Sequence, residues 1–181
     1  MPAWAIKFAV MAGVALSWHL FFDLNEWLLA SYTHASWANW IFMPAALRIV
    51  AVLLFKWVGA FGLMLGALYE VSSDAFASAP YRMILAVSSG LAPALAVWLC
   101  RIAYGIADDL QGLRARHVAA LSIIGAAANS LLISLTLLLA GQLRGDLLPL
   151  VVIFLGDLNG TALVLFAISA VLPLLPTKGS D

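Results

Sequence analysis

The sequence predicts an all-α integral membrane protein, a bundle of about six transmembrane helices of which two are short. Three observations lead to this fold class. Hydrophobic residues make up 65% of the 181-residue chain, charged residues make up only 10%, and long runs carry no charge at all. Such a composition is typical of chains that cross a bilayer. We expect residues 1–176 to form a single transmembrane helical domain and residues 177–181 to form a short polar tail.

Overall charge and cysteine content exclude several classes of function. The formal net charge is zero, whereas nucleic-acid binding needs a dense basic patch that displaces counterions from phosphates. Cys100 is the only cysteine, which excludes a disulfide within the chain and any metal site built from several cysteines. We therefore expect no nucleic-acid partner, no metal and no cofactor.

The first apolar window covers residues 3–22. Lys7 followed by an apolar run resembles a signal peptide, but no Ala-x-Ala cleavage site follows before Trp18, so we interpret the window as a span. The next segment, 23–41, carries several aromatic side chains that favour the headgroup region, namely Trp27, Tyr32, Trp37 and Trp40. Anchoring along the outer membrane surface explains them. The alternative is that Trp27, Trp37 and Trp40 belong to a lid over a cavity or to a docking surface for a partner.

The second and third windows, 42–55 and 57–71, are each shorter than the ~20 helical residues that cross a bilayer core. Lys56 and Trp57 separate them and Gly59 follows at once, a pattern that favours a tight interfacial turn between two short helices. Local thinning of the bilayer, or shielding by longer neighbouring helices, makes short spans tolerable. The alternative is a single helix bent at Lys56.

Three longer windows follow, at 81–105, 117–141 and 147–175. In the first, Pro93 cannot donate a backbone hydrogen bond, which predicts a kink whose freed carbonyls bond to a serine hydroxyl, a water, Asn129 or a ligand. In the second, a polar side chain recurs every seven residues, which places one stripe on a helix face that should pack against protein. The stripe consists of Ser122, Asn129 and Thr136.

Two pairs of glycines, Gly62 with Gly66 and Gly156 with Gly160, lie one helical turn apart and allow close approach of another helix. Such pairs are frequent in apolar sequences. Packing inside the bundle is the preferred interpretation, and a homodimer is the alternative.

Basic residues predict the topology. With six spans, most of them share one side of the membrane: Lys7, Lys56, Arg101, Arg114, Arg116 and Lys178. Arg82 and Arg144 lie opposite. By the positive-inside rule both termini are then cytoplasmic. We expect a multi-pass protein of the bacterial inner (plasma) membrane, with the lipid bilayer around it.

Two charges fall deep in apolar windows, Arg48 in the second and Asp157 in the last. A charge at bilayer depth costs at least ~2.5 kcal/mol and normally has a partner or a task inside the bundle. A permanent Arg48–Asp157 pair is the preferred interpretation. Anion binding or gating by Arg48, and snorkelling of Arg48 to the headgroups, are the alternatives. We expect Asn129 and Asn159 to join the pair in a buried structural or ligand-binding site.

Other polar residues give little support for chemistry. His19 and Asp23 are one helical turn apart at the outer end of the first span, where interfacial capping is preferred over an incomplete metal site. Ser88-Ser89-Gly90 lacks the Gly-x-Ser pattern of an intramembrane serine protease and an intramembrane histidine to activate a nucleophile. We therefore do not expect an enzyme.

Three elements follow one another along the chain. Phe42-Met43-Pro44-Ala45-Ala46-Leu47 opens a short span, Leu65-Gly66-Ala67 closes the next, and Gly156-Asp157 with Gly160 lies in the last. Together they resemble the membrane-associated sensor (MASE) domain of bacterial signalling proteins, over about residues 41–175. The resemblance implies a non-enzymatic role in signal transduction, by receiving a signal or contacting partner proteins, with Asp157 and Arg48 at the family's buried polar positions.

The chain departs from that family's usual pattern. The family often has more spans than the six predicted here, and Ala45-Ala46 replaces the usual glycine after the proline motif. An output domain such as a histidine kinase is also expected but is not seen. The resemblance therefore implies either a trimmed module or a standalone relative whose output lies in another polypeptide.

Two rival functions come from other classes. Six apolar spans in a chain of this length are also typical of solute-binding subunits of vitamin importers. In that case the segment 23–41 is a lid, and Arg48, Asn129, Asp157 and Asn159 line a pocket for a small ligand. The other rival is an accessory subunit of a larger membrane complex, whose tryptophan-rich surface and glycine faces pack against other chains.

Overall fold

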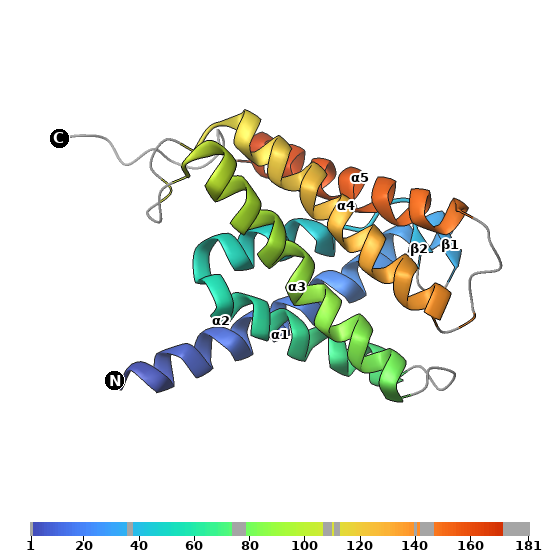
Figure 1. Cartoon of the computed structure of the whole chain (residues 1–181), viewed down its shortest axis with the longest axis horizontal. Helices are drawn as coiled ribbons and strands as arrows, with labels where there is room; N and C mark the ends of the chain where they lie inside the picture. Colours follow the sequence, from blue (N-terminus) through green and yellow to red (C-terminus); the bar gives the residue numbers. More distant parts are fainter. Residues whose placement is uncertain are drawn as a thin grey trace.

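The computed structural model describes residues 2–35, 38–73, 79–106, 110, 113–139, 141 and 147–171. Within these residues, five helices are long and apolar enough to cross a membrane (Figure 1). This finding agrees with an all-α, multi-pass membrane protein. The prediction of about six spanning helices is not confirmed.

Helix α1, Ala3–Leu29, is followed by a 3-10 turn, η1, Ala30–Tyr32, and by two short antiparallel strands, β1, Thr33–Ala35, and β2, Ala38–Asn39. Four helices complete the described chain: α2, Pro44–Ser73; α3, Ala79–Tyr104; α4, Ala115–Leu139; and α5, Leu148–Val171. Each helix packs against the next one along the chain, and α2 also packs against α5. The apolar core lies mainly between α1, α2, α3 and α4.

Helix α2 contains both of the windows that were predicted as separate short spans. Only Lys56 separates its two halves, with backbone angles φ 55° and ψ −133° that no helix contains. A methyl group built on Gly59 would overlap the carbonyl of Ala51, eight residues earlier. Eight residues of straight helix span about 12 Å, so the halves fold back on one another at Lys56. The two halves are therefore two helical segments joined by a one-residue turn at Lys56, as the sequence pattern favoured, and whether each half crosses the membrane stays a prediction.

Both glycine pairs pack inside the chain. Gly62 and Gly66 of α2 lie against Val14 and Trp18 of α1, so close that a methyl group would overlap them. The second pair, on α5, lies instead against carbonyl groups of the segment 39–43. Internal packing thus explains all four glycines, although the partner of the α5 pair is a loop rather than a helix.

The helix ends gather on two sides of the bundle. The N-terminal ends of α1 and α4, the reversal in α2 and the C-terminal ends of α3 and α5 all lie toward the left of Figure 1. The predicted common side of most basic residues corresponds to these ends. Arg144 and the tail 177–181 lie outside the described residues, and the assignment of this side to the cytoplasm stays a prediction.

The polar stripe on α4 faces protein as expected. Asn129 and Thr136 are buried and Ser122 is half-buried. The serines before Pro93 bond within α3, because the Ser88 hydroxyl donates to the Ile84 carbonyl at 2.8 Å and the Ser89 hydroxyl donates to the Leu85 carbonyl at 3.2 Å. These hydroxyls therefore do not cap the carbonyl that Pro93 leaves free.

Candidate functional site

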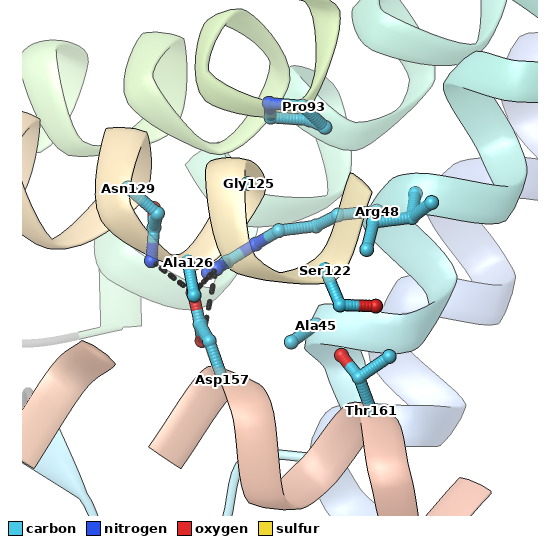
Figure 2. Close-up of a pocket in the computed structure, with 10 residues that line it drawn as sticks. Ala45, Arg48, Pro93, Ser122, Gly125, Ala126, Asn129, Asp157 and Thr161 are labelled. Carbon is cyan, nitrogen blue, oxygen red and sulfur yellow. Dashed lines mark hydrogen bonds and ion pairs between the residues drawn. The ribbon is translucent and has the colours of Figure 1, made fainter. Parts of the chain in front are cut away.

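Arg48 and Asp157 form a buried ion pair between α2 and α5. Nη1 of Arg48 lies 3.0 Å from Oδ2 and 3.3 Å from Oδ1 of Asp157, and each residue is only 6% exposed (Figure 2). Both contacts come from one nitrogen, so the pair lacks the two-nitrogen fork that gives Arg–carboxylate pairs their full strength. Of the alternatives raised for Arg48, the structure shows the pair with Asp157.

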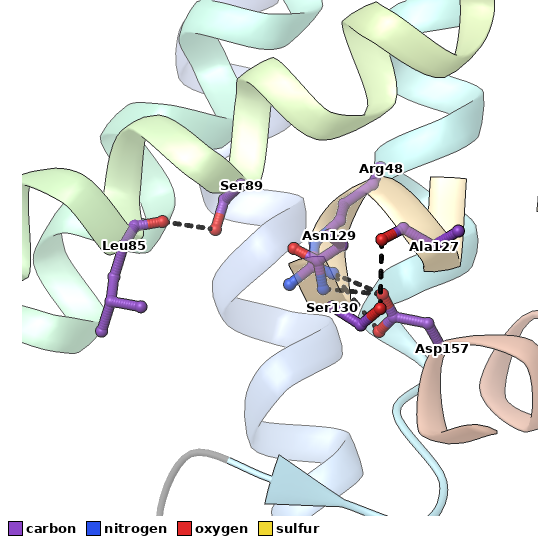
Figure 3. A network of polar contacts seen from close by, with 7 residues as sticks. All are labelled: Arg48, Leu85, Ser89, Ala127, Asn129, Ser130 and Asp157. Carbon is purple, nitrogen blue, oxygen red and sulfur yellow. Dashed lines mark hydrogen bonds and ion pairs between the residues drawn. The ribbon is translucent and has the colours of Figure 1, made fainter. Parts of the chain in front are cut away.

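Asn129 brings a third helix to the pair. Its Nδ2 donates to Oδ2 of Asp157 at 2.7 Å, and its side chain is 2% exposed (Figure 3). Arg48, Asn129 and Asp157 therefore tie α2, α4 and α5 together, and we call them the Arg48 cluster. Buried charges are tolerable in an apolar interior when each of them has a hydrogen-bonding or oppositely charged partner.

Two aromatic rings flank the guanidinium. Its central carbon lies 5.1 Å from the centre of the Trp18 ring and 5.0 Å from the centre of the Phe42 ring. Both distances lie within the ~6 Å range of cation–π attraction. The Arg48 side chain is thus held by α1 and by the segment before α2, in addition to Asp157.

Some hydrogen-bonding capacity of the cluster is unused. Among the described residues, Nε of Arg48, Oδ1 of Asn129 and Nε1 of Trp18 are buried without a hydrogen-bond partner. Buried polar groups almost always have a partner, and a network that is only partly satisfied is less stable than a complete one. These three atoms are therefore where the polar contacts around Arg48 are least complete.

The cavity at the cluster is very small. It has a volume of about 10 Å³ and is lined by Ala45, Arg48, Ile49, Pro93, Ser122, Gly125, Ala126, Asn129, Asp157 and Thr161. That volume is about the minimum for one water molecule, whereas ligand pockets measure roughly 300–1,000 Å³. In the observed arrangement the cavity cannot accommodate an organic solute.

A short segment, residues 39–43, covers one side of the cluster. The Phe42 N–H donates to the Gly156 carbonyl at 2.9 Å, the Met43 N–H donates to Oδ1 of Asn25 at 2.8 Å, and Nδ2 of Asn159 donates to the Trp40 carbonyl at 3.0 Å. Gly156 and Gly160 are the ninth and thirteenth of the 24 residues of α5. The segment therefore reaches the middle of α5 before α2 begins.

Several predicted site residues lie elsewhere. Asn159 is exposed and holds the segment 39–43, rather than joining the buried cluster, because it lies two residues from Asp157 and so points to another face of α5. The tryptophans were predicted to lie at the outer surface: Trp27 is 80% exposed, Trp40 is at the exposed surface, and Trp37 lies outside the described residues. Their role as a lid or docking surface stays a prediction. The aromatic contacts of Trp18 and Phe42 were not predicted, since no sequence signal relates either residue to Arg48.

His19 pairs with a residue of α2 and not with Asp23, its neighbour one turn along α1. Nδ1 of His19 contacts Oε1 of Glu70 on α2, and the ring of Tyr69 packs edge-on against the imidazole with 4.5 Å between ring centres. Asp23 is exposed. A residue on an adjacent helix thus replaces the one-turn neighbour, because α1 packs along the second half of α2 at this level.

No family model, curated protein or solved structure matches this chain.

Proposed function

We propose that this chain is a non-enzymatic membrane sensor-type module, which receives a signal or contacts a partner protein by rearranging its helices around the Arg48 cluster. The cluster itself is the observation that carries the proposal. Three polar side chains from three helices meet in an apolar interior, and part of their hydrogen-bonding capacity is unused. Charges at bilayer depth are expensive, and their usual role is functional.

The element most suited to move is the first half of α2. It carries Arg48, is separated from the second half by the reversal at Lys56, and begins at the segment 39–43. A partner that pulled on this segment would withdraw Phe42 from the guanidinium and weaken the contact between Arg48 and Asp157. Such a two-state element is what a signal can bias. The resemblance to sensor domains supports the same role.

The solute-binding subunit is a second candidate, for one specific reason. A helix that begins near the middle of a neighbouring span, beside buried charges, is the arrangement found at substrate sites of many transporters. Against it stands the cavity of about 10 Å³, which is closed to solutes in this arrangement. The cavity size therefore favours contact with a protein over binding of a small ligand.

Native mass spectrometry of protein extracted gently from its own membrane tests the choice. We expect a retained protein partner, and its retention should fall in an Asp157→Asn variant, which breaks the cluster. Asp23→Asn is the matched control, because it makes the same chemical change on an exposed side chain. A retained small molecule that is lost on Asp157→Asn would instead support the solute-binding candidate and contradict the proposed one.

A further inference from the structure

The small cavity at the Arg48 cluster is lined by polar as well as apolar side chains (Figure 2). Among the described residues, Nε of Arg48 and Oδ1 of Asn129 are buried without a hydrogen-bond partner. Each of these atoms is two bonds away from a nitrogen that contacts Oδ2 of Asp157, namely Nη1 of Arg48 and Nδ2 of Asn129. The two atoms therefore belong to side chains that already meet at one carboxylate oxygen in the wall of the cavity.

The chemistry of the groups decides what each of them can still bind. An ionised carboxylate only accepts hydrogen bonds, so the NH2 group of Asn129 faces Asp157 and the amide oxygen is the available end. Nε of Arg48 is always a donor. The Ser122 hydroxyl, which also lines the cavity, donates to the Val118 carbonyl at 2.9 Å, and its oxygen can still accept. The lining thus offers a donor and two acceptors.

Gly125 keeps space open in the wall of this cavity. The two glycine pairs described above are close-packed against their neighbours, whereas a methyl group on Gly125 would have its nearest neighbours, Ala96 and Ile49, at 3.8 Å. Close approach of another element therefore does not explain this glycine. Glycine inside a helix is also less stable than alanine. The space at Gly125 is thus part of the cavity rather than a requirement of helix packing.

The size and charge of the lining indicate what the cavity can bind. Its volume of about 10 Å³ is near the minimum for one water molecule and excludes an organic solute. Arg48 and Asp157 already neutralise one another, so an added ion of either sign would bring an uncompensated charge into the interior. A purely apolar cavity stays dry, but a water with two to four polar partners is a normal part of a protein interior.

We propose that one buried water molecule binds in this cavity, where it accepts from Nε of Arg48 and donates to Oδ1 of Asn129. Its second hydrogen goes to the Ser122 hydroxyl oxygen. A buried water typically makes about three hydrogen bonds, and these three groups supply them. The water links α2 to α4 by a second route besides Asp157. This role concerns the observed arrangement of the bundle and does not depend on the sensor function proposed above.

X-ray radiolytic labelling tests the site, because hydroxyl radicals formed from a bound water oxidise the side chains beside it. The full chain in lipid nanodiscs receives a short X-ray pulse, and mass spectrometry of its peptides gives an oxidation rate for each residue, corrected for the reactivity of the residue type. Ile49 lines the cavity, Leu53 lies one turn further along α2, and both are 8% exposed. We expect Ile49 to be oxidised faster than Leu53.

Gly125→Ala connects the faster oxidation of Ile49 to this cavity. The added methyl group occupies space in the cavity and should displace the water, so the rate at Ile49 should fall to the rate at Leu53. Gly13→Ala is the matched control, because Gly13 is an exposed helical glycine at which a methyl group meets nothing within 4 Å. It should leave the faster oxidation of Ile49 intact. Circular dichroism checks that both variants are folded.

Two results would overturn the proposal. Equal oxidation rates for Ile49 and Leu53 in the wild type would show that the cavity is dry, and this comparison decides even if Gly125→Ala fails to fold. A faster oxidation of Ile49 that persists in folded Gly125→Ala, or that disappears equally in Gly13→Ala, would show that the radicals come from water outside the cavity.

Discussion

Asp157→Asn tests whether the Arg48 cluster stabilises the bundle as a unit. Asp157 accepts two contacts from Arg48 and one from Asn129, and all three side chains are buried. Replacing the carboxylate with an amide leaves the guanidinium buried without a counter-ion. Removing one partner of a buried pair typically costs ~3–5 kcal/mol. We expect a loss of that size in the free energy of unfolding of the solubilised protein, and a similar loss for Arg48→Leu.

The double variant decides whether the two losses share one cause. With Arg48→Leu and Asp157→Asn together, no unpaired charge remains, so the double variant should cost less than either single change and its loss should fall short of the sum by at least ~3–5 kcal/mol. Unfolding of the detergent-solubilised protein by a denaturing detergent, followed by circular dichroism, gives the four free energies of the cycle. Asp23→Asn controls for the substitution itself. Independent, additive losses would falsify the view that the pair acts as a unit.

The remaining predictions concern backbone conformation and packing elsewhere in the bundle. Lys56→Gly should unfold with a free energy ~1 kcal/mol higher than Lys56→Ala, because both changes remove the lysine side chain and only glycine adopts the positive φ of 55° without strain; equal midpoints of unfolding for the two would contradict strain there. Gly160→Ala should destabilise by ~1–3 kcal/mol more than Gly125→Ala, because a methyl group at 160 overlaps the carbonyl of the loop, whereas at 125 its nearest neighbours are 3.8 Å away. Equal melting temperatures for the two would refute this packing. His19→Gln and Glu70→Gln should each cost about 1 kcal/mol, and the double variant should cost little more than either; a fully additive double variant would show that these side chains do not interact.

Much of the site could be predicted from composition and spacing. Arg48 and Asp157 are the two charges deep in apolar windows, and opposite charges at bilayer depth commonly pair with one another inside a bundle. Asn129 was found because the seven-residue repeat places it on a buried face. These inferences depend only on the helical period and on the cost of burying a charge, both of which are properties of the local sequence.

The parts that could not be predicted depend on long-range packing. Two short helices joined by a tight turn at Lys56 and a single helix bent there have the same apolar pattern, so hydropathy alone does not distinguish them. Asn159 is two residues from Asp157, and only the path of the segment 39–43 shows that its side-chain amide donates to the Trp40 carbonyl. The pairing of His19 with Glu70 likewise depends on which helix packs beside α1, and the spacing of residues along the sequence does not indicate that helix.

The segment 39–43, which precedes α2, explains the positions of two neutral polar residues, Asn25 and Asn159. Irregular backbone at membrane depth needs a hydrogen-bond partner for each exposed group, and it is tolerated only where protein buries it. The segment 39–43 reaches the middle of α5, where Asn159 donates to the Trp40 carbonyl and Asn25 of α1 accepts from Met43. Glycines on α5 allow the backbone to approach closely enough for these bonds.

The same bonds set the position of Arg48. The guanidinium lies one turn inside α2, so any displacement of the segment 39–43 along α5 moves the start of this helix and with it the contact to Asp157. A signal that broke one bond of the loop would therefore act on the ion pair without touching either charge. We therefore predict that the loop and the pair are coupled, so that Asn159→Ala should weaken the Arg48–Asp157 coupling energy although its amide donates to the Trp40 carbonyl and to neither of these side chains. If the coupling measured by the double-variant cycle were the same in an Asn159→Ala background, the loop would play no part in holding the pair.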